Sequence, residues 1–294
     1  MNNLKNRFVG DLLKPLLLLI SFYTFAGSYA LRPEIMEDAD LWWHLRTGQW
    51  IVEHHALPVA DPFSQLGAAQ PWVVYSWLFE VVLYQLYHWF GLLGITLYTA
   101  ALTLAIAAAL LLLVRCFVAD DTQAVFYACI GALAFIPFCN PRPWLFTLLF
   151  FILEYALLNA ARQTGKKRWL AWLPPIFALW ANLHIQFIYG LFLLGFDAVQ
   201  PWLEQFLRGE FSLTKFRENF QPQRWALLFI CILATLITPY HFKLYQQVFE
   251  YAGQRKMYQV VSELQPLSFT SALPRPVARS ASMALWRIST AAAW

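Results

Sequence analysis

Residues 38–48 carry the strongest chemical signal in the chain. The stretch reads Asp-Ala-Asp-Leu-Trp-Trp-His-Leu-Arg-Thr-Gly and lies just after the first hydrophobic segment. Charged groups are costly near lipid, so a cluster of them at a membrane boundary indicates a functional site. A carboxylate placed there could accept a proton from a polar acceptor. Neighbouring acids could also raise one another's pKa, or share a divalent cation through their oxygen atoms.

The two acids of this stretch also have a structural interpretation. Asp38 or Asp40 could cap the start of a helix expected at about 41–54, where the helix dipole favours negative charge. His54 and His55 are a weak signal, because adjacent residues of a helix point in different directions. The residues alone therefore leave capping and acid–base chemistry open.

The composition predicts a membrane protein. Of the 294 residues, 60% are hydrophobic and 13% are charged, whereas a soluble domain carries about 25% charged residues. The net charge of +4 comes without a basic stripe and gives no indication of nucleic-acid binding. The four cysteines lie in or beside apolar segments without C-x-x-C spacing, which indicates neither a disulfide framework nor a zinc site.

The apolar segments predict an all-α polytopic membrane protein with about seven transmembrane helices. Their expected ranges are 13–31, 94–114, 123–139, 144–161, 169–183, 186–200 and 225–240. Several are shorter than the roughly 20 residues that cross a bilayer core. The first segment could instead be a signal peptide cleaved after Ser28-Tyr29-Ala30, although we favour an uncleaved helix.

Basic residues orient these segments with a cytoplasmic N-terminus. Through residue 240, the inner positions then hold twelve basic residues: Lys5, Arg7, Lys14, Arg115, Arg162, Lys166, Lys167, Arg168, Arg208, Lys215, Arg217 and Arg224. The outer positions hold three, Arg32, Arg46 and Arg142, which fits the positive-inside rule. With this orientation, residues 169–200 are expected to form a hairpin that turns near 182–184, rather than one tilted helix. It also makes the aromatic stretch 72–90 an interfacial or re-entrant helix within one long outer loop, residues 32–92.

Several motifs in order resemble one family. They are the stretch 38–48, His55-Ala56-Leu57-Pro58, Asp61-Pro62-Phe63-Ser64, Pro71-Trp72, Trp77-Leu78-Phe79-Glu80, Arg142-Pro143, Trp180-Ala181-Asn182-Leu183-His184, Thr238-Pro239-Tyr240 and Glu263-Leu264-Gln265-Pro266. Together the chain resembles the bacterial membrane glycosyltransferases of the GT-C fold, in the dolichyl-phosphate-mannose-mannosyltransferase-like group. The resemblance covers residues 1 to about 268.

The resemblance implies an inverting glycosyltransferase of the bacterial plasma (inner) membrane. Such an enzyme moves a sugar from a polyprenyl-phosphate donor to an acceptor glycan or lipid on the periplasmic face. It implies Asp40 as the catalytic base, with Asp38 as the second choice.

Five further residues are candidates for substrate binding: Arg142, His184, His44, His55 and Glu80. Arg142 could clamp the donor phosphate through its bidentate guanidinium, or could be an interfacial arginine that snorkels to the membrane surface. The sequence assigns no metal ligands, and the divalent cation that the acids could share is the only cofactor it suggests.

Two regions differ in character. Residues 1–269 are predicted to form the GT-C-like membrane module. Residues 270–294 are rich in small residues, contain Pro274 and Pro276 and lack an apolar span, so we expect a disordered or frame-shifted tail. A non-catalytic or truncated membrane scaffold is the alternative function. A transporter is less favoured, because Glu154 is the main acid within a predicted span and no inverted repeat is visible.

Overall fold

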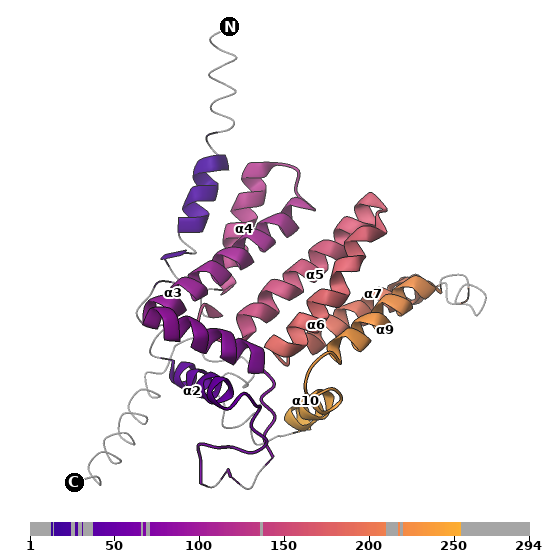
Figure 1. Cartoon of the computed structure of the whole chain (residues 1–294). Helices are drawn as coiled ribbons and strands as arrows, with labels where there is room; N and C mark the ends of the chain where they lie inside the picture. The colour runs from indigo at the N-terminus through magenta and orange to yellow at the C-terminus, as the bar shows by residue number, and fades with distance from the viewer. Residues whose placement is uncertain are drawn as a thin grey trace, which may run out of the picture. The chain divides into compact units, whose positions relative to one another are not determined.

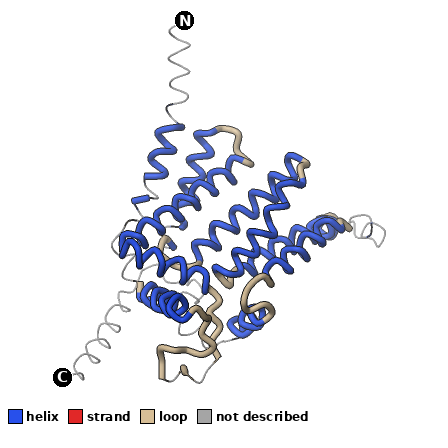
Figure 2. Tube along the Cα trace, viewed as in Figure 1, coloured by secondary structure: helices blue, strands red, loops and turns tan. Residues whose placement is uncertain are grey.

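The computed structural model describes residues 13, 15–24, 27–28, 31, 38–65, 67–68, 71–135, 138–209, 217 and 220–253. These residues form helices and no strand, apart from an isolated bridge between Ala60 and Pro71 (Figure 2). The predicted all-α class is therefore confirmed for this part of the chain. The chain divides into two compact units, Met1–Val248 and Phe249–Trp294. The first unit is described below; the predicted tail 270–294 and the motif 263–266 lie outside the described residues.

Each predicted apolar segment contains part of a helix, and the helix Lys243–Gly253 was not predicted. After the short helix Pro15–Thr24 come α2 (Ala39–His54), α3 (Trp77–Arg115), α4 (Asp121–Phe135), α5 (Trp144–Thr164), the 3-10 helix η3 (Lys167–Trp172), α6 (Leu173–Leu183), α7 (Phe187–Leu207), α9 (Pro222–Thr235) and α10 (Lys243–Gly253) (Figure 1). In α3, Gly91 has φ 60° and ψ −149°, which no helical residue adopts. Since glycine tolerates positive φ, the helix breaks there, between the predicted interfacial stretch 72–90 and the predicted span 94–114.

Helices α6 and α7 form a hairpin against α5. The turn comes at His184, whose φ of −159° and ψ of 137° are extended. His184 contacts Thr147 at the start of α5, whereas Asp197 in α7 pairs with Arg162 near the end of α5. Helix α7 therefore runs in the same direction as α5, and α6 runs against it. The hairpin interpretation of residues 169–200 is correct.

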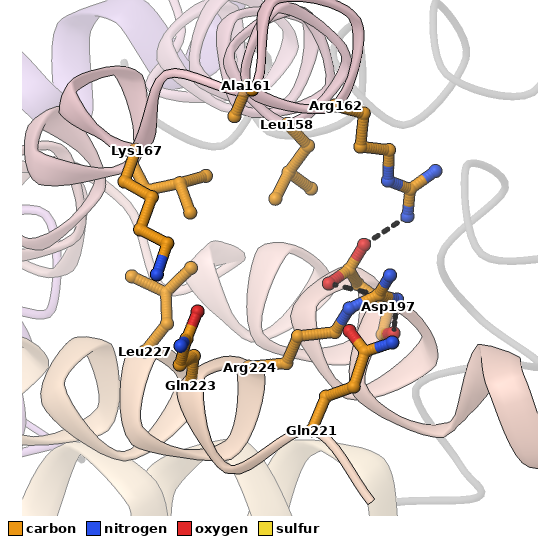
Figure 3. A pocket seen from close by; sticks show the side chains of 11 residues that line it. Leu158, Ala161, Arg162, Lys167, Asp197, Gln221, Gln223, Arg224 and Leu227 are labelled. Carbon is orange, nitrogen blue, oxygen red and sulfur yellow. Dashed lines mark hydrogen bonds and ion pairs between the residues drawn. The ribbon is translucent and has the colours of Figure 1, made fainter. Parts of the chain in front are cut away.

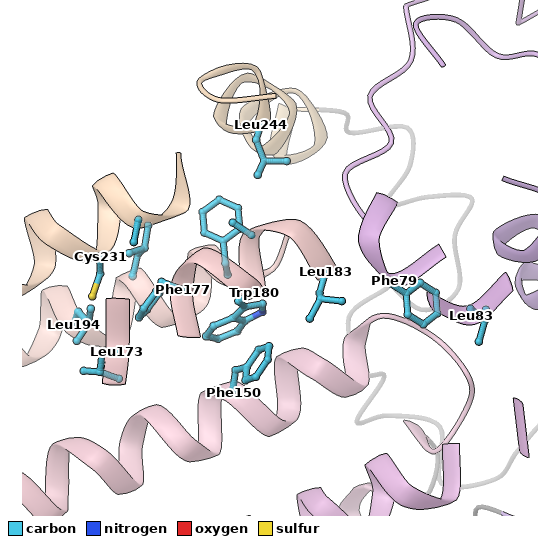
Figure 4. Packing of buried hydrophobic residues seen from close by; sticks show 14 of the residues in the cluster. Phe79, Leu83, Phe150, Leu173, Phe177, Trp180, Leu183, Leu194, Cys231 and Leu244 are labelled. Atoms are coloured by element: carbon cyan, nitrogen blue, oxygen red, sulfur yellow. The ribbon is translucent and has the colours of Figure 1, made fainter. Parts of the chain in front are cut away.

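The main core lies where α5, α6, α7 and α9 meet (Figure 4). Trp180 is fully buried at its centre, with ring centroids 5.8 Å from Phe150 and 5.6 Å from Phe177. Its indole N–H donates to Thr147 Oγ1 at 3.0 Å, so the one polar atom of this side chain is satisfied. This packing fixes the end of α6 against the start of α5.

Helices α2 and α3 approach closely at Gly48. A Cβ atom at this position would lie 2.1 Å from the backbone oxygen of Glu80. We expect Gly48→Ala to lower the free energy of unfolding by about 1–3 kcal/mol, the usual cost of overpacking, although alanine favours helices. Gly195 in α7 is the matched control, because its Cβ would meet no atom within 4 Å. Gly195→Ala should stabilise the protein by about 0.5–1 kcal/mol. Denaturation of both variants measures the contrast, and equal effects would contradict the close approach.

The prediction of about seven transmembrane helices is wrong for the described residues. Two helices, α3 and α5, are long and apolar enough to cross a membrane. Helices α4, α6 and α9 have 15, 11 and 14 residues. At a rise of about 1.5 Å per residue they fall short of a hydrocarbon core about 30 Å thick. Helix α7 has 21 residues, but its second half carries Asp197 and Glu204, which lower its hydropathy.

The apolar surface nevertheless faces outward along several helices. Among the 18 most apolar consecutive residues of α3 and of α5, 44% and 39% are buried within the protein. The other residues of these two stretches are not buried by the rest of the protein. Large hydrophobic side chains are exposed on α3, α4, α7 and α9, among them Leu93, Leu97, Phe126, Ile130, Phe192, Phe196, Phe229 and Leu233. A helix that is apolar on its outer face suits lipid better than water.

Candidate functional site

Six of the seven predicted site residues lie at one end of the helices, which we call the site end: Asp38, Asp40, His44, Glu80, Arg142 and His184. They come from the start of α2, the start of α3, the loop before α5 and the turn between α6 and α7. These segments are up to 146 positions apart, from Asp38 to His184. The fold therefore brings together residues that the sequence presents separately.

Arg142 joins the two acids of the first motif. Its Nε and Nη2 donate to the Oδ2 and Oδ1 atoms of Asp38 at 2.5 and 2.7 Å, while Nη1 lies 2.8 Å from Asp40 Oδ2. The guanidinium also lies over the Trp144 ring, 4.7 Å from its centroid. Pro143 follows directly and disfavours a helical backbone at Arg142, so the chain enters α5 only after the arginine.

The two acids have different surroundings and therefore different capacities. Asp38 is the N-cap of α2, where its Oδ1 accepts from the backbone N–H of Asp40 at 3.1 Å. Its side chain is 8% exposed, whereas that of Asp40 is 56% exposed. The capping interpretation thus applies to Asp38, and Asp40 is the carboxylate that an incoming substrate could reach.

Asp38 is held in its ionised form. Burial by itself would raise the pKa of this carboxyl group, but the hydrogen bonds and charge of Arg142 outweigh it, with smaller help from the Asp40 amide and from His44. The net pKa lies below the ordinary value of 3.8. A carboxylate that binds protons so weakly is a poor general base.

A second polar pair, His44 and Glu80, lies beside the first. His44 Nδ1 is 3.0 Å from Glu80 Oε1, and the His44 ring packs edge-on against Phe79. Glu80 is buried, and its other oxygen, Oε2, has no hydrogen-bond partner within the described residues. The same holds for the buried hydroxyl of Ser76, one turn earlier. Buried polar atoms of this kind need water or a ligand to complete their hydrogen bonds.

His184 lies deeper than the other residues. Its Nδ1 is 2.8 Å from Thr147 Oγ1, which also accepts from Trp180. Burial, and then the charge of His44, lowers the pKa of His184 to about 3, so the ring is neutral. Thr147 belongs to no motif, and nothing in its neighbouring residues indicates its contact with His184. Sequence reasoning therefore missed it.

Asn182 ties three distant segments together at the site end. Its Oδ1 accepts from the indole of Trp77 at 2.9 Å, and its Nδ2 donates to the backbone oxygens of Ala178 and Ile237, both at 2.7 Å. Nearby, the Tyr240 hydroxyl accepts from the backbone N–H of Val74 at 3.1 Å. These contacts give a positioning role to residues of the 77–80, 180–184 and 238–240 motifs.

His55 is the predicted site residue that the structure does not bring to the others. It is exposed at the C-terminal end of α2, with φ 49°. Asp38 caps the other end of this 16-residue helix, about 24 Å away at 1.5 Å per residue. Within the described residues, no group of three or more His, Cys, Asp or Glu side chains could hold a metal ion.

Comparisons of the chain with protein-family models, with curated proteins and with solved structures found no match.

Proposed function

We propose that the chain is a membrane glycosyltransferase that moves a sugar from a polyprenyl-phosphate donor to an acceptor glycan or lipid. The observation that carries this proposal is the site end itself. An exposed carboxylate, Asp40, contacts Arg142 and lies one turn before His44, whose partner Glu80 is buried. The motifs that resemble the GT-C enzymes supply most of these residues, and the outward-facing apolar helices fit a lipid-borne donor.

The proposed reaction needs one base and one leaving group. The acceptor hydroxyl gives its proton to Asp40 as its oxygen attacks the anomeric carbon. The bond from that carbon to the phosphate oxygen breaks, its electron pair stays on the phosphate, and the configuration inverts. The developing negative charge requires a nearby cation or N–H donors.

Arg142 has two roles in this scheme. Its contacts with Asp38 and Asp40 support a positioning role, because the guanidinium fixes the direction of the Asp40 carboxylate. Binding of the donor phosphate by Arg142, as the sequence suggested, remains part of the proposal. Phosphate and carboxylate both match the guanidinium fork, so an arriving phosphate could take over a donor that Asp40 now occupies.

We further propose that the site end faces the periplasm of a bacterial inner membrane. Charge supports this orientation. Gln163 at the end of α5 contacts the backbone oxygen of Cys116 just after α3, so both helices end together, away from the site end. We call that side the basic end; its residues are Arg115, Arg162, Lys166, Lys167, Arg168, Arg208 and Arg224. Positive residues favour the cytoplasmic side.

Labelling of single cysteines tests the orientation. In a chain whose four native cysteines are replaced, Val59→Cys should react with a membrane-impermeant maleimide in intact cells, because Val59 is 85% exposed in the loop after α2. Lys166→Cys, exposed at the basic end, should react only after the cells are permeabilised. The reverse pattern would place the site end in the cytoplasm.

Lipid profiling tests the reaction. Membranes that lack the chain should accumulate the polyprenyl-phosphate sugar, and restoring the chain should return it to its normal level. An unchanged lipid profile, with the chain present and correctly inserted, would instead favour the non-catalytic scaffold.

A further inference from the structure

A cavity of about 210 Å³ opens at the basic end, between α5, η3, α7 and α9 (Figure 3). It is several times larger than the roughly 30 Å³ that one water molecule occupies in the liquid. Leu158, Leu170 and Leu227 give it an apolar part, and polar side chains surround the rest. In Figure 3, Lys167 lies across the cavity from Arg162. This cavity is separate from the site end, because the two lie at opposite ends of α5.

The cavity is lined by an excess of positive charge. Arg162, Lys167 and Arg224 contribute three cations and Asp197 one anion, which leaves a net charge of +2. Gln221 and Gln223 add amide groups to the same lining. A concave site with this balance attracts an anion.

The two arginines are held in place by bonds that occupy only some of their N–H donors. Asp197, which is 8% exposed, pairs with both guanidiniums, and Gln200 Oε1 accepts from both. Arg162 makes these contacts through Nη2. Arg224 makes them through Nη1, which also donates to the backbone oxygen of Asp197. Since a guanidinium carries five N–H donors, each arginine retains donors for a further acceptor. Their fork suits the oxygens of a phosphate.

Tryptophan side chains flank the cavity. Trp172 follows the lining residue Leu170 and is 62% exposed. Trp225, next to Arg224, packs against Trp202 with ring centroids 5.7 Å apart. Tryptophans gather where the hydrocarbon core meets the headgroups. Helix α5, one of the two helices able to cross a membrane, ends at this level.

We propose that this cavity binds the phosphate of an anionic lipid headgroup. The two arginines and Lys167 contact the phosphate oxygens, and the leucines receive the first part of the glycerol backbone or acyl chains. Basic pockets between membrane helices on the cytoplasmic side recognise such headgroups elsewhere. The proposal is independent of the sugar-transfer reaction, because its residues lie at the opposite end of the helices.

Lipid titration of the full-length chain in neutral detergent tests this site. Short-chain phosphatidylglycerol should raise the thermal unfolding midpoint, followed by tryptophan fluorescence, more than phosphatidylcholine does at equal concentration. Lys167→Gln should weaken the apparent phosphatidylglycerol affinity about fivefold, the loss expected for one basic residue near an anionic lipid surface. Lys167 is exposed, so its replacement should not disturb folding.

Lys166→Gln is the matched control, since Lys166 is an exposed neighbour that does not line the cavity. It should change the affinity less than twofold. Equal losses in both variants would indicate diffuse surface attraction and overturn the proposal. So would equal stabilisation by the two lipids. Stabilisation by inorganic phosphate alone, with none by phosphatidylglycerol, would move the ligand from a lipid to a soluble phosphate and would also overturn it.

Discussion

Asp40→Asn should abolish the proposed sugar transfer while leaving the protein folded. The substitution keeps the shape of the side chain and an acceptor oxygen for Arg142, but removes the basic lone pair that takes the proton. Loss of a general base typically lowers the rate about 10²–10⁴-fold. Because the Asp40 side chain is 56% exposed, its neutralisation should cost little stability. Membranes carrying the variant should accumulate the polyprenyl-phosphate sugar as if the chain were absent.

Variants of two other acids test whether Asp40 itself is the base. Glu53→Gln is the matched control, because Glu53 is an exposed acid on α2 near the end opposite Asp40; transfer should remain near normal. Asp38→Asn should retain more activity than Asp40→Asn, since asparagine also caps helices well. Retained transfer in Asp40→Asn would overturn the assignment. Loss of transfer in Asp38→Asn alone would move the base to Asp38.

Arg142→Ala should cause the largest loss of stability at the site end. It leaves the Asp38 carboxylate buried without its main partner, and breaking a buried pair in this way costs about 3–5 kcal/mol. We expect about 3 kcal/mol, since the Asp40 partner is exposed and the ion pair is only partly desolvated. Denaturation in mixed micelles measures this loss. Arg46→Ala, an exposed arginine on α2 that stacks on Phe63, should cost less than about 1 kcal/mol.

A double-mutant cycle with Asp38→Asn tests the cause of that loss. If the unpaired charge is responsible, adding Asp38→Asn to Arg142→Ala should restore part of the stability, which gives a coupling energy between the two sites. The pKa of Asp38 is lowered on folding, so this contribution is fully present above its ordinary, unfolded value of 3.8. It is lost as the pH falls through the lower folded value. A coupling energy of zero at pH 6 would show that Arg142 stabilises the fold in another way.

Local features of the sequence predicted several elements well. The Asp-x-Asp pattern before an apolar stretch indicated a capped helix at about 41–54, and the structure begins α2 at Ala39 with Asp38 as its cap. The bias of basic residues along the chain favoured a hairpin at residues 169–200 over one tilted helix, and the structure contains that hairpin. The capping pattern depends on neighbouring residues and the charge bias on totals along the chain, which is why one sequence suffices to find both.

The number of membrane spans was overestimated because the spans were identified from apolar segments alone. Apolar segments predict burial from water, but they do not distinguish contact with lipid from contact with other helices. Helix α6 shows this, because six of its eleven residues are buried within the protein: Leu173, Phe177, Trp180, Ala181, Asn182 and Leu183. Only packing reveals which apolar faces remain for lipid.

By itself, the sequence determined the helical class, the helix limits near capping and breaking residues, and the set of side chains able to do chemistry. Tertiary structure decided which of them meet. The bond between Asp38 and Arg142 spans 104 positions, and the pairing of Asp197 with Arg162 and Arg224 joins three helices. Ion pairs of this kind carry no periodic signal, since a carboxylate accepts any cation that the fold places within reach. The direction of α5 determines which of these pairs form. Arg142, just before its start, contacts the acids at the start of α2, and Arg162, near its end, contacts Asp197 of α7.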